Sequence, residues 1–215
     1  MQETIKIRSR RYANIELKVI PGHFVTPNSH INKYIDMTTM KTRQSEATAI
    51  AHALSETFVT STVVDTIICM DGTEVIGAYL AQELTRAGIL SQNAHKTIYI
   101  LTPEHDLSGQ MIFRDNMQAM IRDKHVLVLL ASTTTGTTVA RAIESINYYG
   151  GTISGIAAIF SAISKIYGIQ VHALFTKTDL PDYKTCKSDA CELCKAGIPI
   201  DAIANGFGYS KLQGA

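Results

Sequence analysis

Short apolar segments alternate with amphipathic segments along most of the chain. The apolar runs predict buried strands at Val63–Met70, Thr97–Leu101, Val126–Ala131, Ile153–Phe160 and Gln170–Phe175. Apolar residues at helical spacing predict helices at Arg43–Phe58, with Thr42 as the N-cap, at Glu74–Ala87 with Gly88 as its stop, from Val139 to Gly150-Gly151, and in a short segment ending at Tyr167. Because strands and helices alternate from residue 43 to 175, the pattern predicts an α/β fold with a parallel sheet covered on both faces.

The N-terminal residues follow a different pattern. Ile15, Leu17 and Val19 alternate with polar residues, which predicts a strand that ends at Pro21-Gly22. A second extended segment is predicted at about Ile31–Met37. The sequence contains no internal repeat and no low-complexity linker.

A hydroxyl-rich turn connects the strand Val126–Ala131 to the helix that follows. Its residues are Thr133, Thr134, Thr135, Gly136, Thr137 and Thr138. Such a junction gathers unpaired backbone N–H groups and the positive end of a helix dipole at one point, where a phosphate can bind. Gly136 permits a positive φ angle, and the hydroxyls add donors. The alternative is a threonine-rich N-cap without a ligand, but the threonines outnumber what a cap requires, so the pattern favours phosphate binding.

A second polar turn follows the strand Val63–Met70. It consists of Asp71, Gly72, Thr73 and Glu74. Ligands of open parallel sheets bind beyond the carboxyl ends of the strands, where both turns are expected to lie.

Composition narrows the choice of partners. The chain has 215 residues, 46% of them hydrophobic, enough for one sizeable core with a small appendage. A net charge of +1, without a basic run, argues against a nucleic-acid groove or an anionic membrane surface. Apolar stretches stay shorter than the roughly 20 residues of a membrane span, and the N-terminus has no signal-peptide pattern, so we expect a cytoplasmic protein.

Four segments in order resemble the type I phosphoribosyltransferases. Residues 126–138, VLVLLASTTTGTT, resemble the motif that binds phosphoribosyl pyrophosphate (PRPP), and residues 71–77, DGTEVIG, resemble the pyrophosphate-side loop. The polar stretch Thr102–Asp115 stands where the family carries a mobile flap over the active site. Residues 24–36, FVTPNSHINKYID, are similar to the base-binding segment of orotate phosphoribosyltransferases.

The resemblance implies a Rossmann-like sheet under a small N-terminal hood, in a homodimer. It divides the chain into a phosphoribosyltransferase-like domain at 1–176 (hood 1–41, core 42–176) and a C-terminal extension with three cysteines at 177–215. It also implies that Lys33 and Tyr34 face the base, and that the Asp71–Glu74 turn faces pyrophosphate and Mg²⁺. His105 and Arg114 are the titratable and cationic residues of the flap region.

Two departures from the family pattern bear on activity. Active members carry two adjacent acidic residues at the end of the strand before the phosphate turn, where they hold the ribose hydroxyls. The matching residues here are Leu130 and Ala131, whose side chains accept no hydrogen bond. The flap segment also lacks the lysines of the orotate enzymes. Ser132 and Thr133 remain candidates to replace the acidic pair at the ribose. Asp71 or Glu74 remain candidates to hold magnesium.

The sequence therefore supports two hypotheses of different class. The first is a transferase that moves a phosphoribosyl group to a pyrimidine-like base such as orotate. The second is a non-catalytic sensor or regulator that binds PRPP or a nucleotide monophosphate through the same phosphate turn. Leu130 and Ala131 favour the second hypothesis, and the near-complete set of family segments favours the first.

The C-terminal extension carries candidate metal ligands. Cys186, Cys191 and Cys194 have a spacing, including Cys-x-x-Cys, that is typical of a zinc knuckle. A fourth ligand is not evident; His172, Asp189, a water or a residue of a second chain are the candidates. The alternative is three reduced thiols in a surface loop. His23 and His30 flank the base-binding segment and are candidates for ligand contact.

Overall fold

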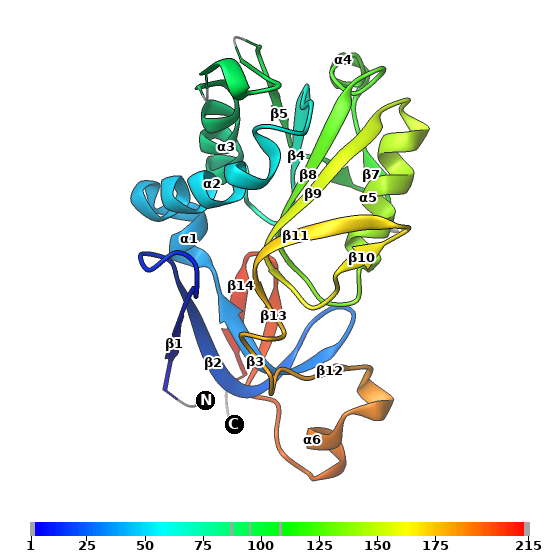
Figure 1. Ribbon diagram of the computed structural model, residues 1–215. Coiled ribbons are helices and arrows are strands. Elements are labelled where there is room, and N and C mark those ends of the chain that lie inside the picture. Colours follow the sequence, from blue (N-terminus) through cyan, green and yellow to red (C-terminus); the bar gives the residue numbers. More distant parts are fainter. Residues whose placement is uncertain (1–2, 87, 95, 108, 213–215) are drawn as a thin grey trace. The chain divides into compact units, whose positions relative to one another are not determined.

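The computed structural model describes residues 3–86, 88–94, 96–107 and 109–212, and the chain forms two compact units. The larger unit is continuous and comprises Met40–Thr176. The smaller unit is built from both ends of the chain, up to Thr39 and from Lys177 onward. Figure 1 shows the elements of each unit in their sequence colours.

The larger unit is built on a six-stranded sheet with the order β10-β11-β9-β8-β4-β5. All neighbours are parallel except β10, which is antiparallel to β11. The strands are β4 (Thr66–Cys69), β5 (Tyr99–Leu101), β8 (His125–Thr133), β9 (Thr152–Ser161), β10 (Lys165–Ile166) and β11 (Ile169–Thr176). The predicted α/β fold with a parallel sheet is confirmed.

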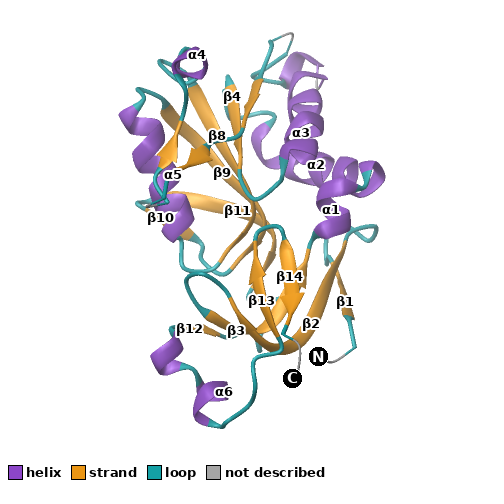
Figure 2. Cartoon of the chain, turned by 180° about the vertical axis from the view of Figure 1, so that it is seen from behind, coloured by secondary structure: helices purple, strands orange, loops and turns teal. Residues whose placement is uncertain are grey.

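Helices cover both faces of this sheet (Figures 1 and 2). They are α1 (Thr38–Thr42), α2 (Gln44–Phe58), α3 (Glu74–Arg86), η1 (Gly88–Leu90), α4 (Asp115–Gln118) and α5 (Thr137–Tyr148). Successive side chains of a strand point to opposite faces. Val128 and Leu130 of β8 pack in one core with Ile143 of α5, while Leu127 and Leu129 lie on the other face, near Phe58 of α2 and Gly77 of α3.

The prediction of a short helix that ends at Tyr167 is wrong, because residues 162–168 form an extended connection that includes β10. Ser161 at the end of β9 is level with Thr176 at the end of β11. The connection must therefore run back along the eight residues of β11, about 26 Å at 3.3 Å per residue. Residues 162–168 span only about 10 Å as a helix, but about 23 Å when extended.

Three predicted boundaries also differ from the structure. Strand β2 (Glu16–Val25) continues past Pro21-Gly22, and its register with β3 shifts between Pro21 and Phe24, where a bulge accommodates the missing proline N–H. Thr42 does not cap α2, because it ends α1 and Arg43 precedes Gln44. Ala87 lies outside the described residues, and Gly88, with φ +70°, opens η1.

The smaller unit is a second six-stranded sheet with the order β12-β3-β2-β13-β14, in which β1 also pairs with β2. Its strands are β1 (Ile5–Arg8), β2, β3 (His30–Asp36), β12 (Thr185–Cys186), β13 (Ala202–Asn205) and β14 (Gly208–Lys211). The short helical turns η2 (Ser188–Ala190) and α6 (Glu192–Lys195) follow β12. Figure 2 shows this sheet in orange.

The two ends of the chain are therefore joined in one sheet. Strand β13 pairs with β2, and β12 pairs with β3. The rings of Phe24, Tyr34 and Tyr209 pack with centroids 5.1–6.1 Å apart, so residues from both ends share a core. The division drawn from the sequence is thus revised: residues 177–215 complete the N-terminal unit instead of forming a separate extension. Among the described residues, no helix is long and apolar enough to cross a membrane.

Candidate functional site

The two predicted ligand-binding turns follow the carboxyl ends of strands of the parallel sheet. They follow β4 and β8, which are neighbouring parallel strands. The Met70 N–H donates to the Leu129 carbonyl at 2.8 Å, and the Thr73 hydroxyl donates to the same carbonyl at 3.2 Å. From β4 the chain passes through α3 to β5, which is the other neighbour of β4 in the sheet. From β8 it passes through α5 to β9, so the two connections lead away from the β8–β4 pair in opposite directions. The turns therefore flank a topological switch point, where open α/β sheets bind ligands.

The threonine turn has the backbone geometry of an anion site. Gly136 has φ +82° and precedes α5, whose first hydrogen bond runs from the Ala140 N–H to the Gly136 carbonyl at 2.8 Å. Within the described part of the chain, the N–H groups of Thr135, Gly136 and Thr138 have no hydrogen-bond partner. The hydroxyls of Thr135 and Thr137 lie 3.0 Å apart. The turn can therefore offer backbone and hydroxyl donors to a phosphate.

The other threonines of the turn differ in their exposure. Thr133 is buried as the last residue of β8, Thr134 and Thr138 are half-buried, and Thr135 and Thr137 are exposed. Thr133 thus belongs to the strand, and the accessible part of the turn begins at Thr134.

The Asp71 turn is a tight reversal of the backbone. Asp71 has φ +57° and Gly72 has φ +79°, and consecutive left-handed residues are costly for a side chain that is not glycine. Thr73 is fully buried, and its hydroxyl donates to the Met70 carbonyl at 2.9 Å, so this side chain holds the turn. Burial raises the pKa of the Asp71 carboxyl, and Glu74 adds to this effect, while Lys41 and His105 oppose it.

Lys41 is a site residue that the sequence did not reveal. It lies in the last turn of α1, it is only 9% exposed, and its Nζ donates to the Asp71 carbonyl oxygen at 2.7 Å. A Cβ atom at Gly72 would lie 3.7 Å from the same Nζ. A buried ammonium group therefore lies on the turn that resembles the pyrophosphate-side loop. The only sequence signal is a single lysine beside Met37 and Met40 in the connection to the first long helix.

The predicted flap is a short hairpin of β6 (Glu104–His105) and β7 (Met111–Ile112). Ser108 lies outside the described residues. The Ser145 hydroxyl of α5 donates to the Met111 carbonyl at 3.0 Å, which fixes β7 against that helix. Arg114 pairs with the Glu104 carboxylate at 2.6 Å, and this hydrogen-bonded pair lowers the pKa of Glu104. The cation of the flap region is thus neutralised within it.

The end of β8 has no carboxylate. Leu130 is fully buried in the core beneath α5, and Ala131 is 4% exposed. Ser132 is exposed, and it is the first side chain of this strand end that offers a polar group to solvent. The residues that replace the acidic pair of the family motif therefore serve packing.

The residues predicted to face the base belong to the smaller unit. Tyr34 is 9% exposed and packs against Phe24 and Tyr209, and burial raises its pKa to about 12, with Asp36 and Tyr209 adding to the effect. Tyr34 therefore contributes to the core of that unit. Lys33 is more accessible, with its Nζ 3.7 Å from a carboxylate oxygen of Asp182.

A second group of chemically active side chains lies in the smaller unit. Cys191 and Cys194 meet His23 and His30, and one ligand atom from each lies within 4.8 Å of those of the others. Among the described residues this group does not include Cys186, whose Sγ is 3.9 Å from the His30 carbonyl oxygen.

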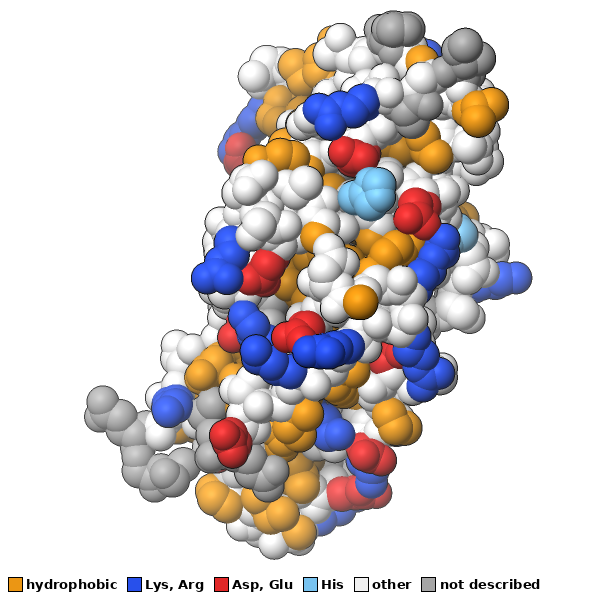
Figure 3. All heavy atoms as spheres, turned by 60° about the vertical axis from the view of Figure 1, so that its left-hand side comes forward, with side chains coloured by type: hydrophobic (Ala, Val, Ile, Leu, Met, Phe, Trp, Pro, Cys, Tyr) orange, Lys and Arg blue, Asp and Glu red, His pale blue; other side chains and the backbone are white. Residues whose placement is uncertain are grey.

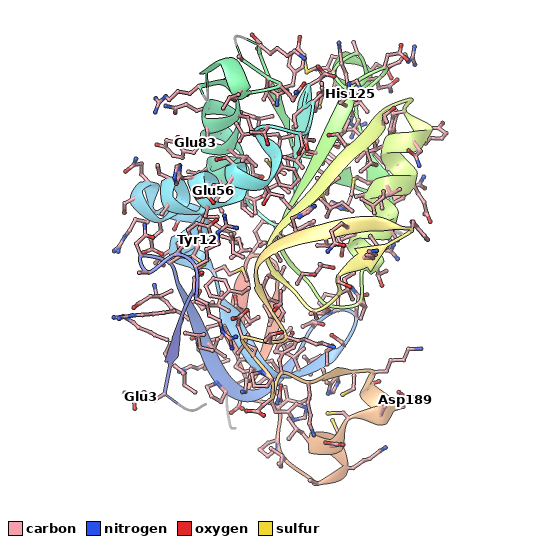
Figure 4. The ribbon with its side chains drawn as sticks, in the orientation of Figure 1. Glu3, Tyr12, Glu56, Glu83, His125 and Asp189 are labelled. Carbon is pink, nitrogen blue, oxygen red and sulfur yellow. The ribbon has the colours of Figure 1, made fainter. Side chains whose placement is uncertain are left out.

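The fourth-ligand candidates from the sequence lie elsewhere. His172 belongs to the larger unit, where its ring packs edge-on against Phe58. Asp189 is exposed and points away from the ribbon of the C-terminal segment (Figure 4). The neighbours of Cys191 and Cys194 in the structure are instead His23 and His30, the two histidines that the sequence placed beside the base-binding segment.

The visible surface agrees with the composition. On the face shown in Figure 3, Lys and Arg side chains are mixed with Asp and Glu and with hydrophobic side chains.

Figure 4 labels His125 at the start of β8, where it pairs with Asp65 at 2.9 Å. This histidine is thus accounted for by a hydrogen bond to Asp65.

Comparison with known proteins agrees with this architecture. No family model matches the chain. The orotate phosphoribosyltransferase of Chlorobaculum parvum is 26% identical over 188 residues, which cover 86% of the chain and 88% of that protein. The crystal structure of orotate phosphoribosyltransferase from Aeropyrum pernix superposes with a TM-score of 0.52 at 20% identity, over 76% of the chain and 90% of that structure.

The chain has the type I phosphoribosyltransferase fold. A third relative in structure is the orotate phosphoribosyltransferase of Mycobacterium tuberculosis in complex with PRPP, with a TM-score of 0.50 and 13% identity over 68% of the chain and 82% of that structure. The resemblance drawn from the four sequence segments is confirmed, and the protein is phosphoribosyltransferase-like.

Proposed function

We propose that the two turns at the carboxyl ends of β4 and β8 bind the phosphates of PRPP or of a nucleoside monophosphate. The observation that carries this proposal is the position of the two turns after the carboxyl ends of the neighbouring strands β4 and β8, where the sheet has its switch point. The M. tuberculosis relative that was crystallised with PRPP supports the choice of ligand.

Each turn has a separate role in this proposal. Residues 134–138 receive the 5′-phosphate, because among the described residues the N–H groups of Thr135, Gly136 and Thr138 are unpaired, and they lie at the positive end of the α5 dipole. The Asp71 turn, with the Lys41 ammonium group, receives pyrophosphate. The carboxylates of Asp71 and Glu74 are the groups in this turn that would hold a Mg²⁺ ion, which favours oxygen ligands and binds together with substrate phosphates.

The reaction of a phosphoribosyltransferase with a pyrimidine-like base such as orotate makes clear what the chain lacks. The base nitrogen forms a bond to C1 of the ribose, the bond from C1 to pyrophosphate breaks, and pyrophosphate leaves with the electron pair. Positive charge develops on the ribose ring during this step. Leu130 and Ala131 supply no negative charge there, so the transition state loses a stabilising interaction that binding does not need.

A second candidate function follows from the same two residues. With Leu130 in the core and Ala131 without a polar group, the protein can recognise PRPP or a nucleotide through its phosphates without turnover. A sensor or regulator of this kind would retain the contacts to the phosphates alone. We therefore expect binding with turnover well below the range of roughly 1–1000 per second that is common for enzymes.

Calorimetric titration with PRPP, pyrophosphate and uridine monophosphate tests the binding site. Gly136→Val should abolish binding, because the variant strains a left-handed residue and brings Cβ within 2.9 Å of Ile163 and Ile166. Gly88→Val is the matched control, since Gly88 has φ +70° with no atom within 4 Å of its Cβ position. Retained affinity in Gly136→Val would contradict the phosphate turn.

A second pair of variants tests the pyrophosphate side. Lys41→Met should weaken pyrophosphate binding about tenfold or more, which corresponds to about 1.4 kcal/mol for one charge-assisted hydrogen bond. Arg43→Met, an exposed cation two residues away, should leave the affinity unchanged. A pyrophosphate-release assay with orotate and PRPP then separates the two functions: turnover in the common enzyme range would establish the transferase and refute the sensor.

A further inference from the structure

We propose that the smaller unit holds a structural zinc ion bound by His23, His30, Cys191 and Cys194. This inference is independent of the phosphate site and does not rest on the proposed function. The four ligand atoms come from β2, β3, the N-cap of α6 (Cys191) and α6 itself (Cys194), and they lie within 4.8 Å of one another. Two imidazole nitrogens and two thiolates form a donor set that is typical of closed tetrahedral zinc sites.

The distances between the ligand atoms agree with the edges of one coordination tetrahedron. With Zn–N near 2.05 Å and Zn–S near 2.3 Å, such edges measure about 3.3 Å between two nitrogens and about 3.6 Å between nitrogen and sulfur. His23 Nε2 and His30 Nδ1 are 3.1 Å apart, and each sulfur lies 3.6 Å from His23 Nε2. The separation between Cys194 Sγ and His30 Nδ1 is 3.4 Å.

The outer hydrogen bonds orient His23 for metal binding. Its Nδ1 lies 2.9 Å from the Ile198 carbonyl oxygen, which can only accept, so Nδ1 carries the proton and donates it. The lone pair of Nε2 then faces the cluster, as is typical of metal-bound histidines. The His23 backbone N–H also donates to the Asp201 carboxylate at 2.8 Å.

A hydrogen-bonded cluster without metal explains this geometry less well. His30 Nδ1 and both cysteine sulfurs approach the same His23 Nε2, whose single lone pair accepts one strong hydrogen bond. A cation at the centre satisfies all four groups at once. When Zn²⁺ binds, Cys191 and Cys194 each release one proton, and two thiolates and two neutral imidazoles leave the site without net charge.

The burial of the ligands indicates a structural role. His23 is 1% exposed, His30 is 9% exposed and Cys191 is 2% exposed, while Cys194 closes the site at the surface. Four protein ligands leave no position for water or substrate, unlike a catalytic zinc. Since residues 23 and 30 belong to the N-terminal hairpin and residues 191 and 194 to the other end of the chain, the ion would fasten the two ends together.

Backbone hydrogen bonds hold the turn at residues 191–197, which carries both cysteines. The Lys195 N–H donates to the Cys191 carbonyl at 3.1 Å, and the Gly197 N–H donates to the Cys194 carbonyl at 3.0 Å, with Gly197 at φ +69°. The turn thus brings the two thiols to the same side.

Metal analysis of the full-length protein tests the site. We expect about one zinc per chain in the purified protein. After removal of the ion by a chelator, added Co²⁺ should produce the visible d–d absorption of a tetrahedral site, together with a thiolate charge-transfer band in the near ultraviolet. Cys194→Ser and His30→Gln should each lose the metal. Cys194 is exposed, so its substitution tests binding without disturbing a core.

Two matched controls distinguish this site from its alternatives. Cys186→Ser and His52→Gln should keep the zinc, because Cys186 lies outside the group of four and His52 pairs with Glu83 on the larger unit. Loss of zinc in Cys186→Ser with retention in His30→Gln would establish a three-cysteine site and overturn the proposal. A metal-free wild-type protein that shows no thiolate band with Co²⁺ would overturn it as well.

Discussion

Leu130 shows at the scale of one residue why the acidic pair cannot simply be restored. It is fully buried beneath α5, whereas Ser132 on the same strand is exposed. Leu130→Asp should lower the free energy of unfolding by roughly 3 kcal/mol or more, because it buries an unpaired carboxyl in an apolar core. Ser132→Asp should change it by less than about 0.5 kcal/mol. Urea unfolding of both variants measures the difference, and equal losses would refute the buried position of Leu130.

The carboxyl of Asp71 should make the stability of the folded protein decrease as the pH rises. Burial raises the pKa of its carboxyl in the folded protein above the usual 3.8, so the folded state keeps a proton that the unfolded state has lost. Its contribution to stability therefore falls as pH rises from 3.8 through the folded pKa. Asp71→Asn cannot ionise and also tolerates φ +57°, so it should melt at a higher temperature than the wild type near neutral pH.

The melting temperatures of both proteins between pH 3 and 7 check this prediction. The two curves should converge at the acidic end and separate as pH rises. Asp123→Asn, at the same φ of +57° in another turn, is the control for the backbone effect of the substitution. Parallel curves for the wild type and Asp71→Asn would show that the Asp71 carboxyl has no raised pKa.

At the scale of an element, the turn between β10 and β11 has a strained backbone that a single substitution can relieve. Tyr167 and Gly168 form its two-residue turn, with φ +48° and +80°. Asn-Gly is the preferred pair where both residues are left-handed. Tyr167 is 66% exposed, and its hydroxyl donates to Glu144 at a long 3.4 Å. Tyr167→Asn should therefore stabilise the protein by about 0.5–1 kcal/mol.

Thermal and urea unfolding measure the effect of this substitution. Tyr167→Phe keeps the ring and the strain but removes the hydroxyl, so it should match the wild type. A destabilised Tyr167→Asn together with a destabilised Tyr167→Phe would mean that the contact to Glu144 outweighs the backbone strain.

At the scale of the whole molecule, the two units differ in how the chain builds them. The larger unit is continuous and contains its own core, whereas the smaller unit needs both ends of the chain. A fragment of residues 40–176 should therefore fold alone, with a cooperative thermal transition, and should bind pyrophosphate, because Lys41 and both turns lie within it. Calorimetry on the fragment checks both expectations, and a fragment without a cooperative transition would refute the independence of this unit.

The sequence by itself determined the parallel sheet, its two covering helix layers and the threonine turn between β8 and α5. These features depend on local patterns: apolar runs, helical spacing, and a glycine among threonines at a strand–helix junction. The replacement of the acidic pair by Leu130 and Ala131 was also evident from the motif alone. Such signals persist because the residues that produce them are neighbours in the chain.

Tertiary structure alone decided how distant segments meet. Lys41 contacts Asp71 through a fold that no local spacing encodes, and β10 is extended only because β9 and β11 are parallel neighbours. Likewise, Cys191 and Cys194 find His23 and His30 because β13 pairs with β2 and β12 with β3, so both chain ends form one sheet. Strand pairing across more than 150 residues follows from the burial of whole sheet faces, which no short window of sequence contains.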